Sequence, residues 1–191
     1  MMQTNLSIIA FLVLVALLAG RALTLRRKGI RALVFGKTDK SDFLLLLLVA
    51  WLLYPALAKA IGLPVLEPLV RPLWEAAAPG WAGLALCALA LAGFAATLKS
   101  FGDSFRVGID EEKPDRLVTT GMFAISRNPL YLCIILFLLG IFLVHRNITV
   151  IVAVVVFLFA VNRQIIREEA FLKERYGSEY EEYCRKTRRY L

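Results

Sequence analysis

The feature that most constrains this sequence is the grouping of its apolar residues into long blocks. A helix needs about 20 mostly apolar residues to cross the hydrocarbon core of a bilayer. Hydrophobic residues make up 59% of the 191 residues, and the mean hydropathy is +0.68. We expect a transmembrane helix from each of five blocks: Leu6–Leu25, Phe43–Leu63, Trp81–Leu98, Pro129–Val144 and Ile148–Val161. The predicted fold class is therefore an all-α integral membrane protein with five transmembrane helices.

No polar linker divides the chain, so we expect a single membrane domain over residues 1–191. Residues 1–98 would hold the first three spans, and residues 99–191 a core with the last two spans and the charged tail. The first block is not expected to be a cleavable signal peptide. No basic residue precedes it, whereas Arg26, Arg27 and Lys28 follow it.

The last two blocks are separated only by His145, Arg146 and Asn147. One continuous helix over 129–161 would be about 50 Å long and would put Arg146 near the middle of the bilayer, where a charge is costly. A tight helical hairpin avoids both problems. Because both spans are short, their helices are expected to continue at the far end from the turn, through Asn128 and past Asn162.

The placement of the basic residues predicts the orientation. Of the 23 Lys and Arg residues, 20 lie in the segments 21–40, 99–127 and 163–189, and the opposite loops keep only Arg71 and Arg146. By the positive-inside rule, the N-terminus is expected outside and these three segments in the cytoplasm. This topology accounts for the net charge of +8 without a nucleic-acid partner.

Histidine and cysteine usage gives no sign of a metal site. His145 is the only histidine, Cys87 and Cys133 lie in apolar blocks, and Cys184 lies in the charged tail. This spacing predicts neither a metal centre nor a disulfide framework.

The polar segment before the fourth span is the first candidate for chemistry. Asn128-Pro129 suits a helix start, because Asn can cap, Pro fits the first turn, and the free amides there favour an anion. A simple capped helix without any ligand explains these two residues equally well.

The tail after the fifth span is the second candidate. A helix leaving this span is expected to end near Gly177, and Ser178 with Glu181 has the spacing of a capping box that begins a second short helix. Glu169 and Lys173, four residues apart, are expected to pair. The alternative is an amphipathic helix resting on anionic headgroups. The adjacent acids at 168 and 169 argue against it, because anionic lipid repels them.

Together the two segments resemble the isoprenylcysteine carboxyl methyltransferase family and the related phospholipid methyltransferases. The first segment reads Leu117-Val-Thr-Thr-Gly121-x-Phe123 and then Arg127-Asn-Pro-x-Tyr131. The second reads Glu168-Glu-x-x-Leu172 and then Tyr176-Gly-x-x-Tyr180-x-x-Tyr183. The resemblance covers about Ser104–Leu191.

The resemblance implies an integral membrane enzyme that uses S-adenosylmethionine and releases S-adenosylhomocysteine. Its cofactor-binding residues would be Leu117, Val118, Gly121, Phe123, Arg127, Asn128, Pro129, Tyr131 and Glu168. The acceptor would be lipophilic and would enter from the bilayer, an isoprenylcysteine-like carboxylate first and a phospholipid amine as the alternative.

The sequence departs from the family pattern at two positions. Eukaryotic members usually have His at the position of Asn128, which cannot titrate near neutral pH. The arginine that orients the substrate in the family lies at the register of Gln164 here. We assign that role to Arg163, which lies nearer the membrane than Arg167, and take Arg163, Arg167 and Glu169 together as the catalytic candidates.

Two other classes of protein compete with this interpretation. The Tyr-rich tail is also similar to that of membrane sterol and enone reductases, which use NADPH, but those proteins are longer and carry further motifs upstream. A membrane scaffold or transporter would show an internal repeat or ionisable groups within the spans, and Lys59 is the only candidate.

Overall fold

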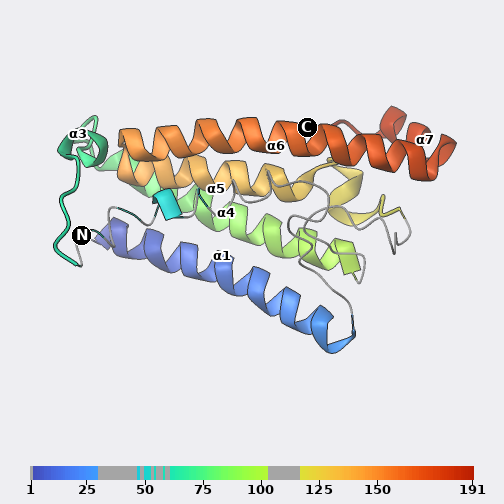
Figure 1. The fold of residues 1–191 in the computed structure, drawn as a ribbon, viewed down its shortest axis with the longest axis horizontal. Helices are drawn as coiled ribbons and strands as arrows, with labels where there is room; N and C mark the ends of the chain where they lie inside the picture. Colours follow the sequence, from blue (N-terminus) through green and yellow to red (C-terminus); the bar gives the residue numbers. More distant parts are fainter. Residues whose placement is uncertain are drawn as a thin grey trace.

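The computed structural model describes residues 2–29, 47, 50–52, 54, 58, 61–102 and 117–191. Its main elements are four long helices that lie side by side along one axis (Figure 1). They are α1 (Met2–Arg27), α4 (Ala78–Phe101), α5 (Pro129–His145) and α6 (Ile148–Tyr176). The short elements are α3 (Glu67–Val70), η3 (Gly121–Ala124) and α7 (Ser178–Lys186).

These described elements confirm the all-α class. Among them, α1, α4 and α6 are long and apolar enough to cross a membrane, and α5 is a shorter apolar helix of 17 residues. The second predicted span, Phe43–Leu63, lies mostly outside the described residues. The total of five spans and the orientation in the membrane therefore stay predictions.

The helical hairpin between the last two predicted spans is confirmed. The chain reverses at Arg146, whose left-handed backbone (φ 52°) lets its N–H bond to the carbonyl of Phe142 at 2.6 Å. The Asn147 side chain then caps α6 by accepting a bond from the Val150 N–H at 3.0 Å. The turn keeps the Arg146 charge at the end of both helices rather than in the middle of one.

The extension of these helices away from the turn is confirmed for one helix and wrong for the other. Helix α6 continues past Asn162 to Tyr176, so its charged second half follows directly from the apolar first half. Helix α5 does not continue through Asn128, which has a non-helical backbone, and begins at Pro129. Proline lacks an N–H and disfavours helical geometry at the residue before it, so the helix starts there.

Small residues bring α4 and α5 into close contact. A Cβ added at Gly83 would lie 2.5 Å from the carbonyl oxygen of Gly140, and one at Gly140 would lie 2.6 Å from the sulfur of Cys87. Such small-residue contacts replace the hydrophobic driving force that is lost in a lipid environment. They fix the α4–α5 pair on which the rest of the bundle is built.

The two ends of the bundle carry the polar groups. The turn end comprises the α5–α6 turn, the start of α1 and the segment 73–77, and the site end comprises loop 117–128, the last turns of α6 and α7 (Figure 1). Helix α1 is tied to α4 at both ends, where Gln3 donates to the carbonyl of Ala77 at 3.0 Å and Arg21 donates to that of Gly102.

Candidate functional site

The first part of the site is a tight turn placed on the end of α4. Gly121 has a positive φ of 64°, and a Cβ at this position would collide with the Ser100 hydroxyl. That hydroxyl accepts a bond from the Met122 N–H at 3.1 Å, which fixes η3 against α4. The buried ring of Phe123 then packs edge-on against Phe101, with centroids 4.5 Å apart.

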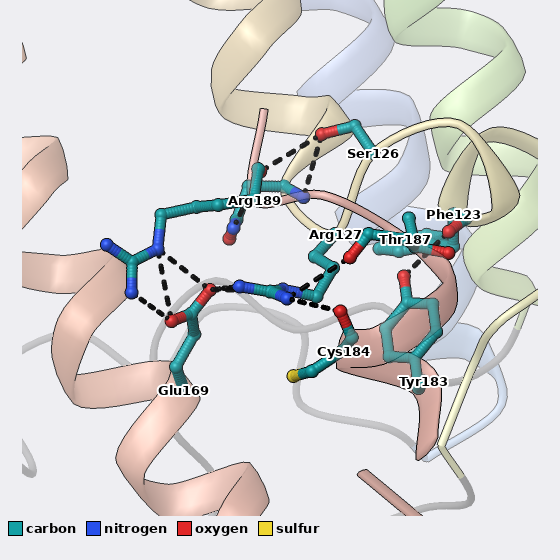
Figure 2. Close-up of polar contacts among 9 residues, drawn as sticks. Phe123, Ser126, Arg127, Glu169, Tyr183, Cys184, Thr187 and Arg189 are labelled. Carbon is teal, nitrogen blue, oxygen red and sulfur yellow. Dashed lines mark hydrogen bonds and ion pairs between the residues drawn. The ribbon is translucent and has the colours of Figure 1, made fainter. Parts of the chain in front are cut away.

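Helix α7 packs over this turn. Tyr180 and Tyr183 are buried, lie three residues apart on one face of α7, and form an apolar cluster with Phe123, Leu117 and Val118. The Tyr183 hydroxyl also donates to the carbonyl of Phe123 at 2.7 Å (Figure 2). The predicted cofactor-binding residues of this loop thus lie directly against the C-terminal helix.

Three charged side chains meet where the loop joins α5 (Figure 2). Arg127 donates from Nη2 to Glu169 Oε1 at 3.0 Å, and Arg189 donates from Nη2 to Glu169 Oε2 at 2.6 Å. Arg189 Nε adds bonds of 3.1 Å to both carboxylate oxygens. We call this group the Arg127–Glu169–Arg189 triad, and its residues come from the loop, from α6 and from the segment after α7.

Backbone carbonyls of the C-terminal segment complete the surroundings of Arg127. Its Nη1 donates to the carbonyls of Cys184 at 3.3 Å and Thr187 at 3.1 Å, and its backbone N–H donates to the carbonyl of Arg188 at 2.9 Å. Two of these acceptors lie at the end of α7, where a cation is favoured by the helix dipole. The Arg127 side chain is therefore committed to protein contacts.

The neighbouring loop residues bond to the same segment. The carbonyl of Arg189 accepts from the Ser126 hydroxyl at 3.2 Å and from Asn128 Nδ2 at 3.1 Å. The Ser126 hydroxyl in turn accepts from the Asn128 N–H at 3.1 Å. The side chain of Asn128 thus makes this contact instead of capping α5.

Glu168 connects α5 with α6. Its Oε1 accepts from the Tyr131 hydroxyl at 2.8 Å and from Gln164 Nε2 at 2.9 Å. Gln164 is the residue at the family's arginine register, and it supports the carboxylate from one turn earlier on α6. The buried ring of Pro129 lies at the start of α5, two residues before Tyr131.

The two arginines assigned to the substrate lie on the same helix. Arg163 is exposed and Arg167 is half-buried, and they stand four residues apart on one side of α6. Glu169 lies farther along, with only 14% of its side chain exposed. The structure therefore brings the two predicted motif segments together at one end of the bundle. Arg163 and Arg167 lie on α6, between this end and the apolar first half of the helix.

Two predicted local contacts are wrong. Glu169 does not pair with Lys173, because the arginines of the triad take its carboxylate, and Lys173 pairs with Glu181 at 3.2 Å. Ser178 does not cap α7, because Gly177 holds the N-cap position and no side chain bonds there. The end of α6 at Gly177 (φ 50°) and the short helix after it are confirmed.

The electrostatics of the triad favour a charged carboxylate. Glu169 lies beyond the apolar part of α6, outside the predicted span. Burial acts to raise its pKa, but the hydrogen bonds and charges of Arg189 and Arg127 outweigh this and hold the pKa below its usual range. Burial also raises the pKa of Tyr183 to about 12, so its hydroxyl stays a donor at neutral pH.

Sequence reasoning missed several residues of this site, above all Arg189, Ser126 and the carbonyls of residues 184–188. One signal was available for Arg189. The motif segments contain two adjacent acids, Glu168 and Glu169, but only one arginine, Arg127. One acid was therefore left without a cation from the motif to pair with. Among the described residues, no group of three or more His, Cys, Asp or Glu side chains is arranged to hold a metal ion.

Comparison with known proteins supplies one match. The family model described as phospholipid methyltransferase matches residues 79–179, which run from the start of α4 to the start of α7. No curated protein matches the chain.

Proposed function

Because this chain belongs to the phospholipid methyltransferase family, whose model covers more than half of it, we propose that it methylates a lipophilic acceptor with S-adenosylmethionine. Family membership makes it a membrane methyltransferase, and the apolar helices agree with that. The proposal adds the cofactor, the acceptor and the residues that serve each of them.

One observation carries the proposal beyond the family. The two motif segments are separated in sequence by the whole helical hairpin, yet Tyr131 bonds to Glu168 and Arg127 bonds to Glu169. Both contacts lie at the end where α6 changes from apolar to charged. A water-soluble cofactor and a lipid-soluble acceptor can meet at such a boundary.

The residues present fit S-adenosylmethionine. The hydroxyl of Tyr180 is buried and bonds to no oxygen or nitrogen atom of the described residues, and the weakly polar thiol of Cys184, one turn later on α7, lies beside it. Burial, and after it the negative charge of Glu169, raises the pKa of Tyr180 above its usual range, so the hydroxyl stays protonated. A buried donor without a strong partner costs up to about 1–3 kcal/mol, which a polar ligand would recover.

The fit extends to the apolar and charged parts of the cofactor. Leu117 and Val118 are half-buried beside Tyr180 and offer apolar surface to the nucleoside. The carboxylate of Glu168 supplies a negative charge that suits a cationic ligand. The proposed binding residues are Leu117, Val118, Gly121, Phe123, Arg127, Asn128, Pro129, Tyr131 and Glu168, with Arg127 acting through the backbone that it fixes.

We assign the acceptor to Arg163 and Arg167. S-adenosylmethionine supplies an electrophilic methyl group for an in-line displacement. An isoprenylcysteine-like carboxylate is already ionised at neutral pH and needs no general base, so orientation by a cation is sufficient. A guanidinium can hold such a carboxylate through two parallel hydrogen bonds. Glu169 is assigned a positioning role, since both its oxygens are bonded to arginines.

The site end is proposed to face the cytoplasm, where the cofactor is available. Most of the basic residues that the structure describes lie at the last turns of α1 and α4, in loop 117–128, in the charged half of α6 and in the segment from α7 onward, all toward this end, which is the bias of cytoplasmic loops. The acceptor then enters sideways from the inner leaflet.

A phospholipid amine is the second candidate acceptor, favoured by the description of the matched family. The two acceptors give products of different chemistry. A methyl ester releases labelled methanol in base, whereas an N-methyl amine keeps its label.

The test is transfer of a labelled methyl group from S-adenosylmethionine to native lipid extract by the detergent-purified protein. We expect a labelled lipid that releases its label in base as volatile methanol. A label that base does not convert to methanol would replace the carboxylate with the amine, and no labelled lipid at all would contradict methyl transfer to lipid. NADPH should not stabilise the protein, whereas S-adenosylhomocysteine should raise its melting temperature.

Variants of the two site residues test the mechanism. Arg163→Ala and Glu168→Ala are expected to lose methyl transfer while the protein still inserts and folds. Arg175→Ala, which removes an exposed arginine near the end of the same helix, is the matched control and should stay active. Turnover equal to wild type in both site variants would contradict the roles proposed for these two residues.

A further inference from the structure

We infer that residues 187–189 form a strap that fixes the loop before α5, and that Arg189 is a positioning residue for S-adenosylmethionine. The inference rests on the proposed function. It extends the site to a segment that lies beyond residues 79–179, the range of the family match.

The strap acts first through its backbone. The carbonyls of Thr187, Arg188 and Arg189 accept bonds from Arg127 Nη1, the Arg127 N–H and Asn128 Nδ2, at 2.9–3.1 Å. These three bonds hold the two residues directly before Pro129, and so they set where α5 begins. The first amides of α5 and the ring of Tyr131 take their positions from that starting point.

The strap acts next through the Arg189 side chain. Its guanidinium bonds to both oxygens of Glu169, the same carboxylate that receives Arg127. Arg189 thus orients the carboxylate, and the carboxylate orients Arg127. None of the three needs to touch the cofactor for this chain of contacts to set the wall of its site.

The helices are held together by contacts that do not involve the strap. The hairpin turn, the Tyr131–Glu168 bond and the close α4–α5 contact through Gly83 and Gly140 hold the helices without it. The side chain of Arg189 is 41% exposed, so removing it leaves no buried cavity. Its loss is therefore expected to loosen the loop rather than to unfold the protein.

The test compares Arg189→Ala, Arg189→Lys and wild type in methyl transfer and in stabilisation by S-adenosylhomocysteine. In Arg189→Ala we expect the KM for S-adenosylmethionine to rise about tenfold, with a smaller change in kcat, because the loop is misplaced. Lysine keeps the charge but not the two-pronged contact, so Arg189→Lys should lie between the two. Arg185→Ala, an exposed arginine at the end of α7, is the matched control and should behave as wild type.

Three results would overturn the inference. One is an Arg189→Ala variant with the KM and the ligand-induced melting shift of wild type. Another is a loss of kcat alone, and the third is an Arg189→Lys variant no better than Arg189→Ala. If Arg189→Ala does not fold, Arg189→Lys and Ser126→Ala, which removes a donor to the Arg189 carbonyl, serve instead. A KM equal to wild type in both would then reject the strap.

The wild-type protein separates this failure from failure of the proposed function. If S-adenosylhomocysteine does not stabilise wild type and no methyl is transferred, the proposed function is wrong. If wild type responds and Arg189→Ala responds equally, only the strap is wrong.

Discussion

The two ends of the bundle use polar groups in different ways. At the turn end, the contacts are mostly between a side chain and a backbone carbonyl, as from Arg146 to Ala76 and from Thr149 to Leu69, with Ser7 and His145 as a neutral pair 3.0 Å apart. At the site end, the largely buried carboxylate of Glu169 and guanidinium of Arg127 meet a second, partly exposed arginine, Arg189, and the three come from separate segments.

The contrast shows where this protein places interactions that cost free energy to form. Satisfying a carbonyl at the turn end lets the chain reverse and adds modest stability. Taking a carboxylate and an arginine out of water is seldom the most stable solution, and apolar residues of similar volume often do as well. Such a group is expected where geometry at a site matters more than stability.

The largest effect is expected from Glu169→Ala, which removes the centre of the triad. Two arginines would then lie together without their carboxylate, at a cost of about 3 kcal/mol in unfolding free energy. Methyl transfer should fall about 100-fold because the loop before α5 loses its anchor. Labelled-methyl transfer and unfolding in detergent measure the two effects. Glu174→Ala, which removes an exposed acid on the same helix, is the control. An active Glu169→Ala variant would show that the charged contacts at the site end matter no more for methyl transfer than the contacts at the turn end.

The next effect is expected in Gly140→Ala, which lies between the two ends and nearer the turn end. The new Cβ would lie 2.6 Å from the Cys87 sulfur and 2.6 Å from the Gly83 carbonyl oxygen. Overpacking of this kind costs about 1–3 kcal/mol. Since α4 and α5 reach both ends, the melting temperature and methyl transfer should fall together. Gly20→Ala meets nothing within 4 Å and should leave both unchanged. A loss in only one of the two readouts would contradict the shared interface.

A smaller effect is expected at the turn end, in Ser7→Ala. The variant loses the bond to His145 and should lose about 1 kcal/mol of stability. Its kcat and KM should equal those of wild type, because the change lies at the opposite end from the site. Thr4→Ala, an exposed residue one turn earlier, is the control for stability. A kinetic defect in Ser7→Ala would show that the ends are coupled.

The smallest effect is a dependence of stability on pH. The pKa of Glu169 is below its usual value of 4.5 in the folded protein, so its stabilising contribution is present above pH 4.5 and is lost as the pH falls through the folded value. Wild type should therefore lose more melting temperature on acidification below pH 4.5 than Glu169→Gln does. Equal slopes for the two proteins would show that the triad does not hold a charged carboxylate.

The sequence was sufficient to predict features that depend on the conformation or the free-energy cost of a single residue in its local surroundings. The hairpin followed from the penalty for Arg146 in mid-bilayer, and the end of α6 followed from Gly177. It was not sufficient to predict the partner of Glu169, because the rule that pairs opposite charges four residues apart on a helix selected Lys173. The actual partners, Arg127 and Arg189, are 42 and 20 residues away in the sequence. Their contact with Glu169 depends on how α7 packs against the loop, and a rule based on local sequence spacing cannot predict that.

The capping prediction failed for a related reason. A capping box needs a residue between helices that is free to turn its side chain toward the new helix. Here the only residue between α6 and α7 is Gly177, which has no side chain.

That single-residue joint has an effect on how the site assembles. A linker of one residue leaves α7 few orientations relative to α6, so little conformational entropy remains to be lost when its tyrosines dock. The carbonyls of Cys184 and Thr187, which accept hydrogen bonds from Arg127, are consequently held in place before a ligand binds. Lengthening the joint with flexible residues would weaken the site without altering any group that touches a ligand.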